Sequence, residues 1–342
     1  MFLSQKIKEF QPLIDWIESN QSPSGMIFWD DKKKFDAWDH FECLTALAIL
    51  GRKKSFLKGL DWFVDNLSKD SQIFSLYKGE KITQKYYEIH HAIYFSVPLL
   101  QGFYIFEEID LLKKNFETLK KIVEKTINSR DDYGFFYWAE KNGEFQDNSL
   151  ISATSSIYLS LKAAIEIYKF LNEDTKNLED ITKSIEQQFI GDMSRFNRDG
   201  IERSRFSMDA YYPYLAGINL DSSKLLDLLS DFYVPGMGIK CVKEEPWVTF
   251  AESSEAIISL IRVGEIKFAR KIMSEIENFK NEDGIFPTGY QYSEKIFWPD
   301  ERSTWTNAAY IIAKDCLYDV TKKKEGLVSL ISAKGQDFLH VS

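Results

Sequence analysis

The feature that most restricts the fold of this chain is a helical unit that recurs along its 342 residues. Each copy is predicted to hold an amphipathic helix, a short turn that combines glycine with an aromatic residue, a polar loop and a second, more uniformly apolar helix. Six such turns begin near residues 21, 71, 132, 199, 235 and 283. Self-similarity of this kind indicates a fold assembled from repeated units.

The two helices of each unit differ in their apolar surface. Residues 265–280 and 53–67 each carry one apolar stripe with lysine or glutamate between its members, which predicts one face in water. Residues 41–50, 151–167 and 306–317 are rich in Ala, Ser and Ile on nearly every face, which predicts burial on all sides. Twelve helices that alternate in this way predict an all-α fold of two concentric rings, an (α/α)6 toroid. We expect only short loop strands, near Gly238–Val242.

The domain organisation follows from the absence of any Gly-, Ser- or Pro-rich linker in the sequence. We predict a single toroid domain over residues 1–320. The segment 321–342 loses the repeated pattern, and we expect it to be a loosely packed C-terminal tail.

Composition excludes several classes of function. Lys and Arg number 43 against 52 Asp and Glu, so the net charge of −9 argues against nucleic acid as a partner. Cys43, Cys241 and Cys316 lie far apart without a CxxC pair, which suits a reducing compartment. The longest apolar stretch, near residues 92–106, is too short to span a bilayer. We therefore expect a soluble, cytoplasmic protein, and the sequence leaves its oligomeric state open.

Aromatic residues make up 15% of the chain, which indicates an aromatic-lined cavity. In a toroid the loops that lead into the inner helices meet at one end. Six helix N-termini, each with a partial positive charge, would then face one cavity and favour an anion.

Acidic and aromatic residues are concentrated where the inner helices are predicted to begin. Asp36 and Asp39, with Trp38 between them, open the first inner helix. Their spacing places both carboxyls on one face, where they would act as a general acid or bind a cation. The alternative is that Asp36 caps the helix. Tyr87, His90 and His91 open the second, where histidine is suited to shuttle protons. Adjacent residues do not share a helical face, so we do not expect both histidines in one site.

Asp209 is the strongest single candidate for a catalytic acid. It precedes the fourth inner helix beside Tyr211 and Tyr212, and aromatic walls raise the pKa of a carboxyl group. Arg203 and Arg205 lie just upstream, where they would clamp an anionic substrate. The alternative is that Ser207 caps the helix while the tyrosines pack.

The fifth and sixth entries supply the remaining candidates. Thr249 to Glu252 matches a capping box, so we assign Glu252 a structural role and Glu255 the functional one, with Trp247 beside them. At the sixth entry, two tryptophans would stack a sugar ring or stabilise a cation around an acid. These residues are Trp298, Glu301, Arg302 and Trp305. The alternative is a local Glu301–Arg302 salt bridge.

Three features together resemble the terpenoid cyclase/protein prenyltransferase superfamily, and more narrowly bacterial prenyltransferase-like and squalene-cyclase-like proteins. They are the Q-xxx-G-xxx-W turn at Gln21, Gly25 and Trp29, the Asp-Gly-aromatic turns, and the alternating helices. The resemblance implies the same toroid, a small isoprenoid substrate with which the protein makes peripheral contact as a lipidic molecule, and Mg²⁺ if that substrate is a diphosphate. The sequence lacks the family's Asp-x-Asp-Asp, Asp-Asp-x-x-Asp and Asp-x-Cys strings. No metal ligand is therefore carried over.

The leading hypothesis is an isoprenoid enzyme in which Asp209 or Asp39 protonates an alkene. The alternative is a carbohydrate enzyme (a glycoside hydrolase, lyase or epimerase), since these share the toroid. A hydrolase would take a carboxylate pair from Asp39, Asp209, Glu255 and Glu301. A third hypothesis is a non-catalytic binding toroid.

Overall fold

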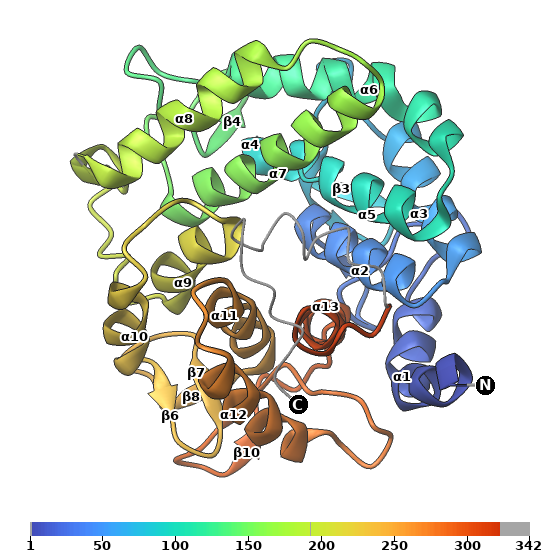
Figure 1. The fold of residues 1–342 in the computed structure, drawn as a ribbon, viewed down its shortest axis with the longest axis vertical. Helices are drawn as coiled ribbons and strands as arrows, with labels where there is room; N and C mark the ends of the chain where they lie inside the picture. The colour runs from blue at the N-terminus through green and yellow to red at the C-terminus, as the bar shows by residue number, and fades with distance from the viewer. Residues whose placement is uncertain (1, 192, 322–342) are drawn as a thin grey trace.

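A computed structural model describes residues 2–191 and 193–321. Its helices form two concentric rings (Figure 1). The inner ring runs through α2 (Ala37–Ile49), α4 (Ile89–Ile93) with α5 (Ser96–Phe106), α7 (Ile151–Phe170), α9 (Ser207–Ala216), α11 (Phe250–Arg262) and α13 (Thr304–Tyr318). The outer ring holds α1 (Phe2–Ser19), α3 (Lys53–Asp65), α6 (Ile109–Ile127), α8 (Lys176–Ile190), α10 (Ser223–Ser230) and α12 (Ile266–Ile276).

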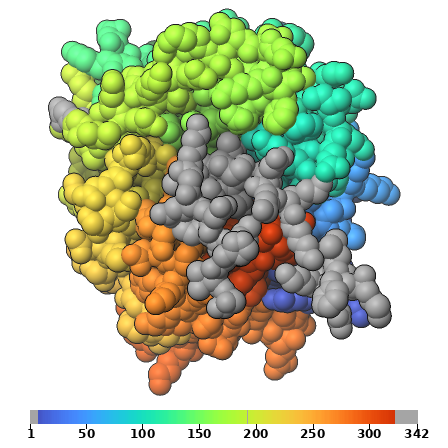
Figure 2. Space-filling view, in the orientation of Figure 1, coloured from blue at the N-terminus to red at the C-terminus, as the bar shows by residue number. Residues whose placement is uncertain are grey.

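Contacts between the inner helices close the ring. Each packs against the next, α2 on α5, α5 on α7, α7 on α9, α9 on α11 and α11 on α13, and α13 returns to α2. The space-filling view shows successive segments of the chain following one another around the rim of the molecule, in the order of their colours (Figure 2). The (α/α)6 toroid expected from the sequence is therefore confirmed.

The two predicted kinds of helix are both present. In α2 every residue except Trp38 is buried, whereas α12 buries only Ala269, Ile272, Met273 and Ile276 along one stripe. An inner helix has neighbours on both sides as well as an outer helix behind it. It therefore buries nearly its whole surface, while an outer helix buries one face.

Strands are more numerous than predicted. One antiparallel sheet contains β1 (Lys34–Phe35), β2 (Phe74–Lys78), β3 (Lys81–Glu88), β4 (Ala139–Lys141) and β5 (Glu144–Phe145). The other contains β6 (Tyr233–Val234), β7 (Gly238–Lys240), β8 (Trp247–Thr249), β9 (Gly289–Gln291) and β10 (Ile296–Phe297). Only β7 lies where strands were expected. The first five residues of β3 are exposed, so that strand carries no apolar alternation in its sequence.

Two predicted helix boundaries are wrong. Tyr87 lies near the end of strand β3 instead of opening a helix, because β3 pairs with β4 up to Glu88 and Ala139. The segment from Ser207 to Pro213 does not precede the fourth inner helix but forms most of it, with Pro213 inside α9.

Among the described residues, none of the helices combines the length and apolarity that crossing a bilayer requires. The single-domain boundary at residue 320 stays a prediction. The predicted tail lies outside the described residues from 322 onward.

Candidate functional site

Four carboxyl groups on two inner helices form the core of the site. Asp39 and Glu42 lie on α2, and Glu252 and Glu255 lie on α11, in each case three residues apart and so on one helical face. All four are buried, with exposures of 7% for Asp39, Glu42 and Glu252 and 3% for Glu255. Burial and then the negative charges of Asp36, Glu42, Glu255 and Glu252 hold the pKa of Asp39 well above its usual range.

Two tyrosines fix the deeper carboxyls of this cluster. Tyr211 donates a hydrogen bond to Glu255, and Tyr94 donates one to Glu42. Burial raises the pKa of Glu42 to about 7 and that of Glu255 well above its usual range, although both hydrogen bonds oppose the rise. Asp39, Glu42 and Glu255 therefore hold protons near neutral pH, as a general acid must.

Aromatic rings stand beside the carboxyls. The half-buried Trp38 ring meets Tyr212 edge to face at 5.1 Å, and His90 at 4.9 Å. Trp305, at the start of α13, lies 6.0 Å from Trp29. Apolar walls next to carboxyls are suited to grip a sugar ring and to keep an acid protonated.

The structure contradicts the capping interpretation of Glu252. Thr249 precedes α11 but its side chain makes no capping bond, and its Oγ1 has no partner among the described residues. Glu252 instead lies beside Cys241 and, after burial, is the largest cause that raises the pKa of that thiol. Its carboxyl is therefore available for chemistry.

Asp36 does cap its helix, as the alternative interpretation held. Its Oδ1 accepts from the backbone N–H groups of Trp38 at 2.8 Å and Asp39 at 3.4 Å. Its other oxygen lies 3.8 Å from Nε2 of His91. Asp36 thus joins the first inner helix to the second.

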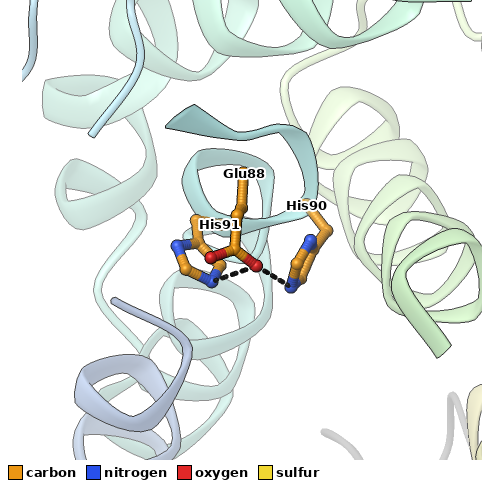
Figure 3. A group of neighbouring side chains, drawn as sticks. All are labelled: Glu88, His90 and His91. Carbon is orange, nitrogen blue, oxygen red and sulfur yellow. Dashed lines mark ion pairs between the residues drawn. The ribbon is translucent and has the colours of Figure 1, made fainter. Parts of the chain in front are cut away.

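His90 and His91 meet at one point, contrary to prediction. Nε2 of each faces the same Glu88 oxygen, at 3.9 Å and 3.6 Å, with one ring on either side of the carboxylate (Figure 3). The helical-face argument failed because α4 is a single turn and the carboxylate belongs to the end of β3. Burial, and then the charge of His91, holds the pKa of His90 well below its usual range.

Asp209 has neighbours of its own. It lies in the first turn of α9, where Asn197 Nδ2 is 3.4 Å from its Oδ2. Burial raises its pKa to about 6 against the opposing effects of Asn197 and Arg203. Arg203 pairs with Asp199 and Arg205 with Glu244, so each guanidinium of the predicted anion clamp already has an acidic partner.

The remaining predicted residues surround the strands that lead into the inner helices. Glu301 binds Lys34 at 3.0 Å and Trp29 Nε1 at 3.1 Å. Arg302 lies over Trp16 and near Asp283, so the alternative of a local Glu301–Arg302 salt bridge is wrong. Elsewhere on these strands, Trp247 packs edge to face on the exposed Trp298, and Tyr87 stacks on Phe74.

Sequence reasoning missed Glu42 and Tyr94. Glu42 had a usable signal, since it is an acid within an otherwise apolar stretch that was predicted to be buried on all sides. Burying an acid in such a helix costs free energy, so its presence indicates a function, and here it is part of the carboxyl cluster.

A groove of 970 Å³ lies between the end of α1 and the β2–β3 turn. Trp16, Asn20, Phe28, Lys32 and Lys78 are among its lining residues, and no member of the carboxyl cluster is.

Comparisons with known proteins point to sugars. No protein-family model matches the chain. It is 26% identical over 308 residues to an MMP endo-(1,4)-3-O-methyl-alpha-D-mannosidase of Mycolicibacterium hassiacum, covering 89% of this chain and 85% of that protein. Among solved structures, a D-mannose isomerase matches with a TM-score of 0.68 at 11% identity over 94% of this chain and 97% of its own. An alpha-amylase from Clostridium perfringens matches with a TM-score of 0.65 at 13% identity over 93% and 98%.

The resemblance to terpenoid cyclases and prenyltransferases, and the isoprenoid substrate drawn from it, are therefore wrong. The turns and alternating helices that carried it belong to the toroid, which the sugar enzymes share. The lipidic contact and the Mg²⁺ of a diphosphate substrate depended on that hypothesis and are withdrawn with it. The carbohydrate alternative is the better supported one.

Proposed function

We propose that this chain is a glycoside hydrolase that cleaves α-linked mannosides within a longer glycan. The observation that carries the proposal is the buried carboxyl cluster shared by α2 and α11, in a chain similar over 89% of its length to an endo-mannosidase. Glycoside hydrolysis needs one protonated carboxyl and one carboxylate across the scissile bond.

Asp39 is the proposed general acid. Its raised pKa keeps a proton on the group, and its Oδ2 has no hydrogen-bond partner among the described residues, so the proton has no competing acceptor there. In the reaction Asp39 protonates the glycosidic oxygen as the bond to the anomeric carbon breaks.

Glu252 is the proposed second carboxylate. It stands in the first turn of α11, where the positive end of the helix favours a negative charge. It acts either as the nucleophile that attacks the anomeric carbon or as the general base that takes a proton from the attacking water. Glu255 lies one turn deeper and accepts a hydrogen bond from Tyr211. Its proposed role is electrostatic, because its charge helps to raise the pKa of Asp39.

The aromatic side chains Trp38, Tyr212 and Trp305 suit a sugar that carries apolar O-methyl groups. A methyl ether buries carbon without needing a donor, and aromatic faces favour that contact. We therefore expect 3-O-methylated α-(1,4)-mannosides to be cleaved faster than unmethylated ones.

To test this proposal, the purified protein is incubated with defined α-(1,4)-linked manno-oligosaccharides, with and without 3-O-methyl groups, and separately with an α-glucan and with free mannose, and the products are identified. Shorter manno-oligosaccharides should appear, and Asp39→Asn and Glu252→Gln should each slow hydrolysis by about 10²- to 10⁴-fold. Asp209→Asn is the matched control, with an expected loss below about tenfold, because Asp209 lies among other partners.

Two results would replace this proposal. Full hydrolysis by both Asp39→Asn and Glu252→Gln would remove the cluster from the chemistry. Conversion of free mannose to its ketose without hydrolysis would make the chain a sugar isomerase instead.

A further inference from the structure

We propose that Glu88, His90 and His91 form a binding site for one divalent transition-metal cation, at the junction of β3 and α4. One atom of each side chain, a carboxylate oxygen or an imidazole nitrogen, lies within 4.8 Å of the others. The carboxylate stands between the two rings (Figure 3). Asp36 stands at the edge of this group, with its Oδ2 3.8 Å from His91 Nε2.

The state of the two imidazoles points to a missing partner. His90 and His91 are 4% and 2% exposed. Within the described part of the chain, Nε2 of each ring faces a Glu88 oxygen, and that of His91 also an Asp36 oxygen, at 3.6–3.9 Å, while Nδ1 of each ring is buried without a hydrogen-bond partner. The Nε2–oxygen distances are longer than hydrogen bonds, so each Nε2 is placed to bind an ion that lies beside the Glu88 carboxylate.

The geometry needs little change to accept an ion. Bonds from zinc to nitrogen or carboxylate oxygen are about 2.0–2.2 Å long, so ligand atoms around one ion lie about 3–3.5 Å apart. The observed separations of 3.6 and 3.9 Å from the Glu88 oxygen are only slightly wider. Glu88 has room to move, since its side chain is 21% exposed.

A neighbouring tyrosine orients the carboxylate ligand, as an outer partner does in metal sites. Tyr86 donates its hydroxyl to Glu88 Oε1 at 3.1 Å, which leaves Oε2 to face the rings. Trp38 packs edge to face on His90.

The donor set selects the class of cation. Two imidazoles with one or two carboxylates suit Zn²⁺, Mn²⁺ or Co²⁺, whereas Mg²⁺ and Ca²⁺ prefer oxygen ligands alone. The site adjoins the proposed catalytic cluster through Asp36 and Trp38, yet it uses none of the proposed acid–base residues.

Metal binding to the full chain tests the proposal directly. Protein made without a polyhistidine tag is stripped with a chelator and dialysed against Zn²⁺, Mn²⁺ or Co²⁺, and bound metal is counted by mass spectrometry. We expect about one equivalent of at least one cation, and the visible spectrum of bound Co²⁺ should report nitrogen and oxygen ligands. His90→Gln and His91→Gln should each weaken binding on the order of 100-fold, since loss of an outer partner alone costs 10- to 100-fold.

Two further variants sharpen the result. His340→Gln controls for binding by any histidine and should bind as the original chain does. Asp39→Asn should also keep its metal, so this proposal and the proposed hydrolase can fail separately. Melting in chelator verifies that each variant is folded. Substoichiometric binding of all three cations by the original chain, or equal affinity in folded His90→Gln and His91→Gln, would overturn the site.

Discussion

Replacing Glu42 by glutamine tests whether the carboxyl cluster holds protons in the folded chain. The glutamine side chain keeps the shape of the glutamate and an oxygen that accepts the Tyr94 hydroxyl, but it has no charge to bury. The substitution therefore changes the dependence of stability on pH far more than it changes packing.

The expected magnitude follows from the pKa of Glu42, which burial raises from an ordinary 4.5 to about 7. Below pH 4.5 the group is protonated in both the folded and the unfolded chain and has no pH-linked cost. As pH rises toward 7, the unfolded chain ionises first, so the folded state loses stability, and the loss is complete above pH 7. The difference between the folded and unfolded pKa of Glu42 corresponds to a loss of about 3 kcal/mol in the free energy of unfolding. About 2–3 kcal/mol of that loss falls between pH 5 and pH 8.

Urea unfolding of both chains at pH 5 and pH 8 measures this change. The free energy of unfolding of Glu42→Gln, relative to the original chain, should rise by about 2–3 kcal/mol between the two pH values. Glu117→Gln, at an exposed position on α6, is the matched control and should show no such trend. A relative change below about 1 kcal/mol would mean that Glu42 is ionised in the fold, and the argument for a protonated cluster would fail.

Two further predictions concern stability. Gly25→Ala should destabilise the fold by about 1–3 kcal/mol in urea unfolding, because Gly25 has φ +120° and an added Cβ would lie 2.2 Å from the Lys58 carbonyl oxygen. Gly79→Ala is the control and should cost less, because Gly79 is also at positive φ but lies in open space. Lys314→Met should cost about 1–3 kcal/mol at pH 7 by removing the ammonium group that pairs with Glu277. Burial raises the Glu277 pKa, but the hydrogen bonds of Lys314 and Tyr310 and the nearby lysine charges together outweigh burial, so the pKa is lowered. The loss should therefore shrink toward pH 3, and a pH-independent loss would contradict it.

The ring architecture could be predicted from sequence because it depends on local periodicity. The striped segment at 265–280 and the apolar segment at 41–50 each carry the pattern that their burial demands, and α12 and α2 lie there. The sheets could not be predicted in this way. Strands such as β3 are held by pairing with partners as distant as Lys141, and their exposed residues leave no apolar alternation.

The site could be predicted only where one helix turn contains the information. Asp36 and Asp39 were found because their spacing is local, and the capping role of Asp36 follows from the same turn. Meeting points between elements were missed. The Glu88 carboxylate reaches both His90 and His91 only because β3 ends where α4 begins. The carboxyls of α2 and α11 come together because both helices pack against α13, and no local pattern records that long-range packing.

The substrate class was mistaken for a related reason. Aromatic walls and acids at the starts of inner helices suit a carbocation and a sugar alike, so the residue types alone do not separate the two. The absent Asp-rich strings were the discriminating observation in the sequence.

Closure of the inner ring has a consequence for how the chain is made. The last inner helix, α13, packs between α11 and α2, and Thr304 is hydrogen bonded through its hydroxyl and its backbone N–H to the Phe28 and Trp29 carbonyls, some 276 residues earlier. A nascent chain that does not yet include α13 has an open ring, and the apolar flank of α2 that α13 will cover is exposed to the solvent. Synthesis at about 5–20 residues per second would keep that flank exposed for tens of seconds. During this interval we expect the growing polypeptide to depend on chaperones.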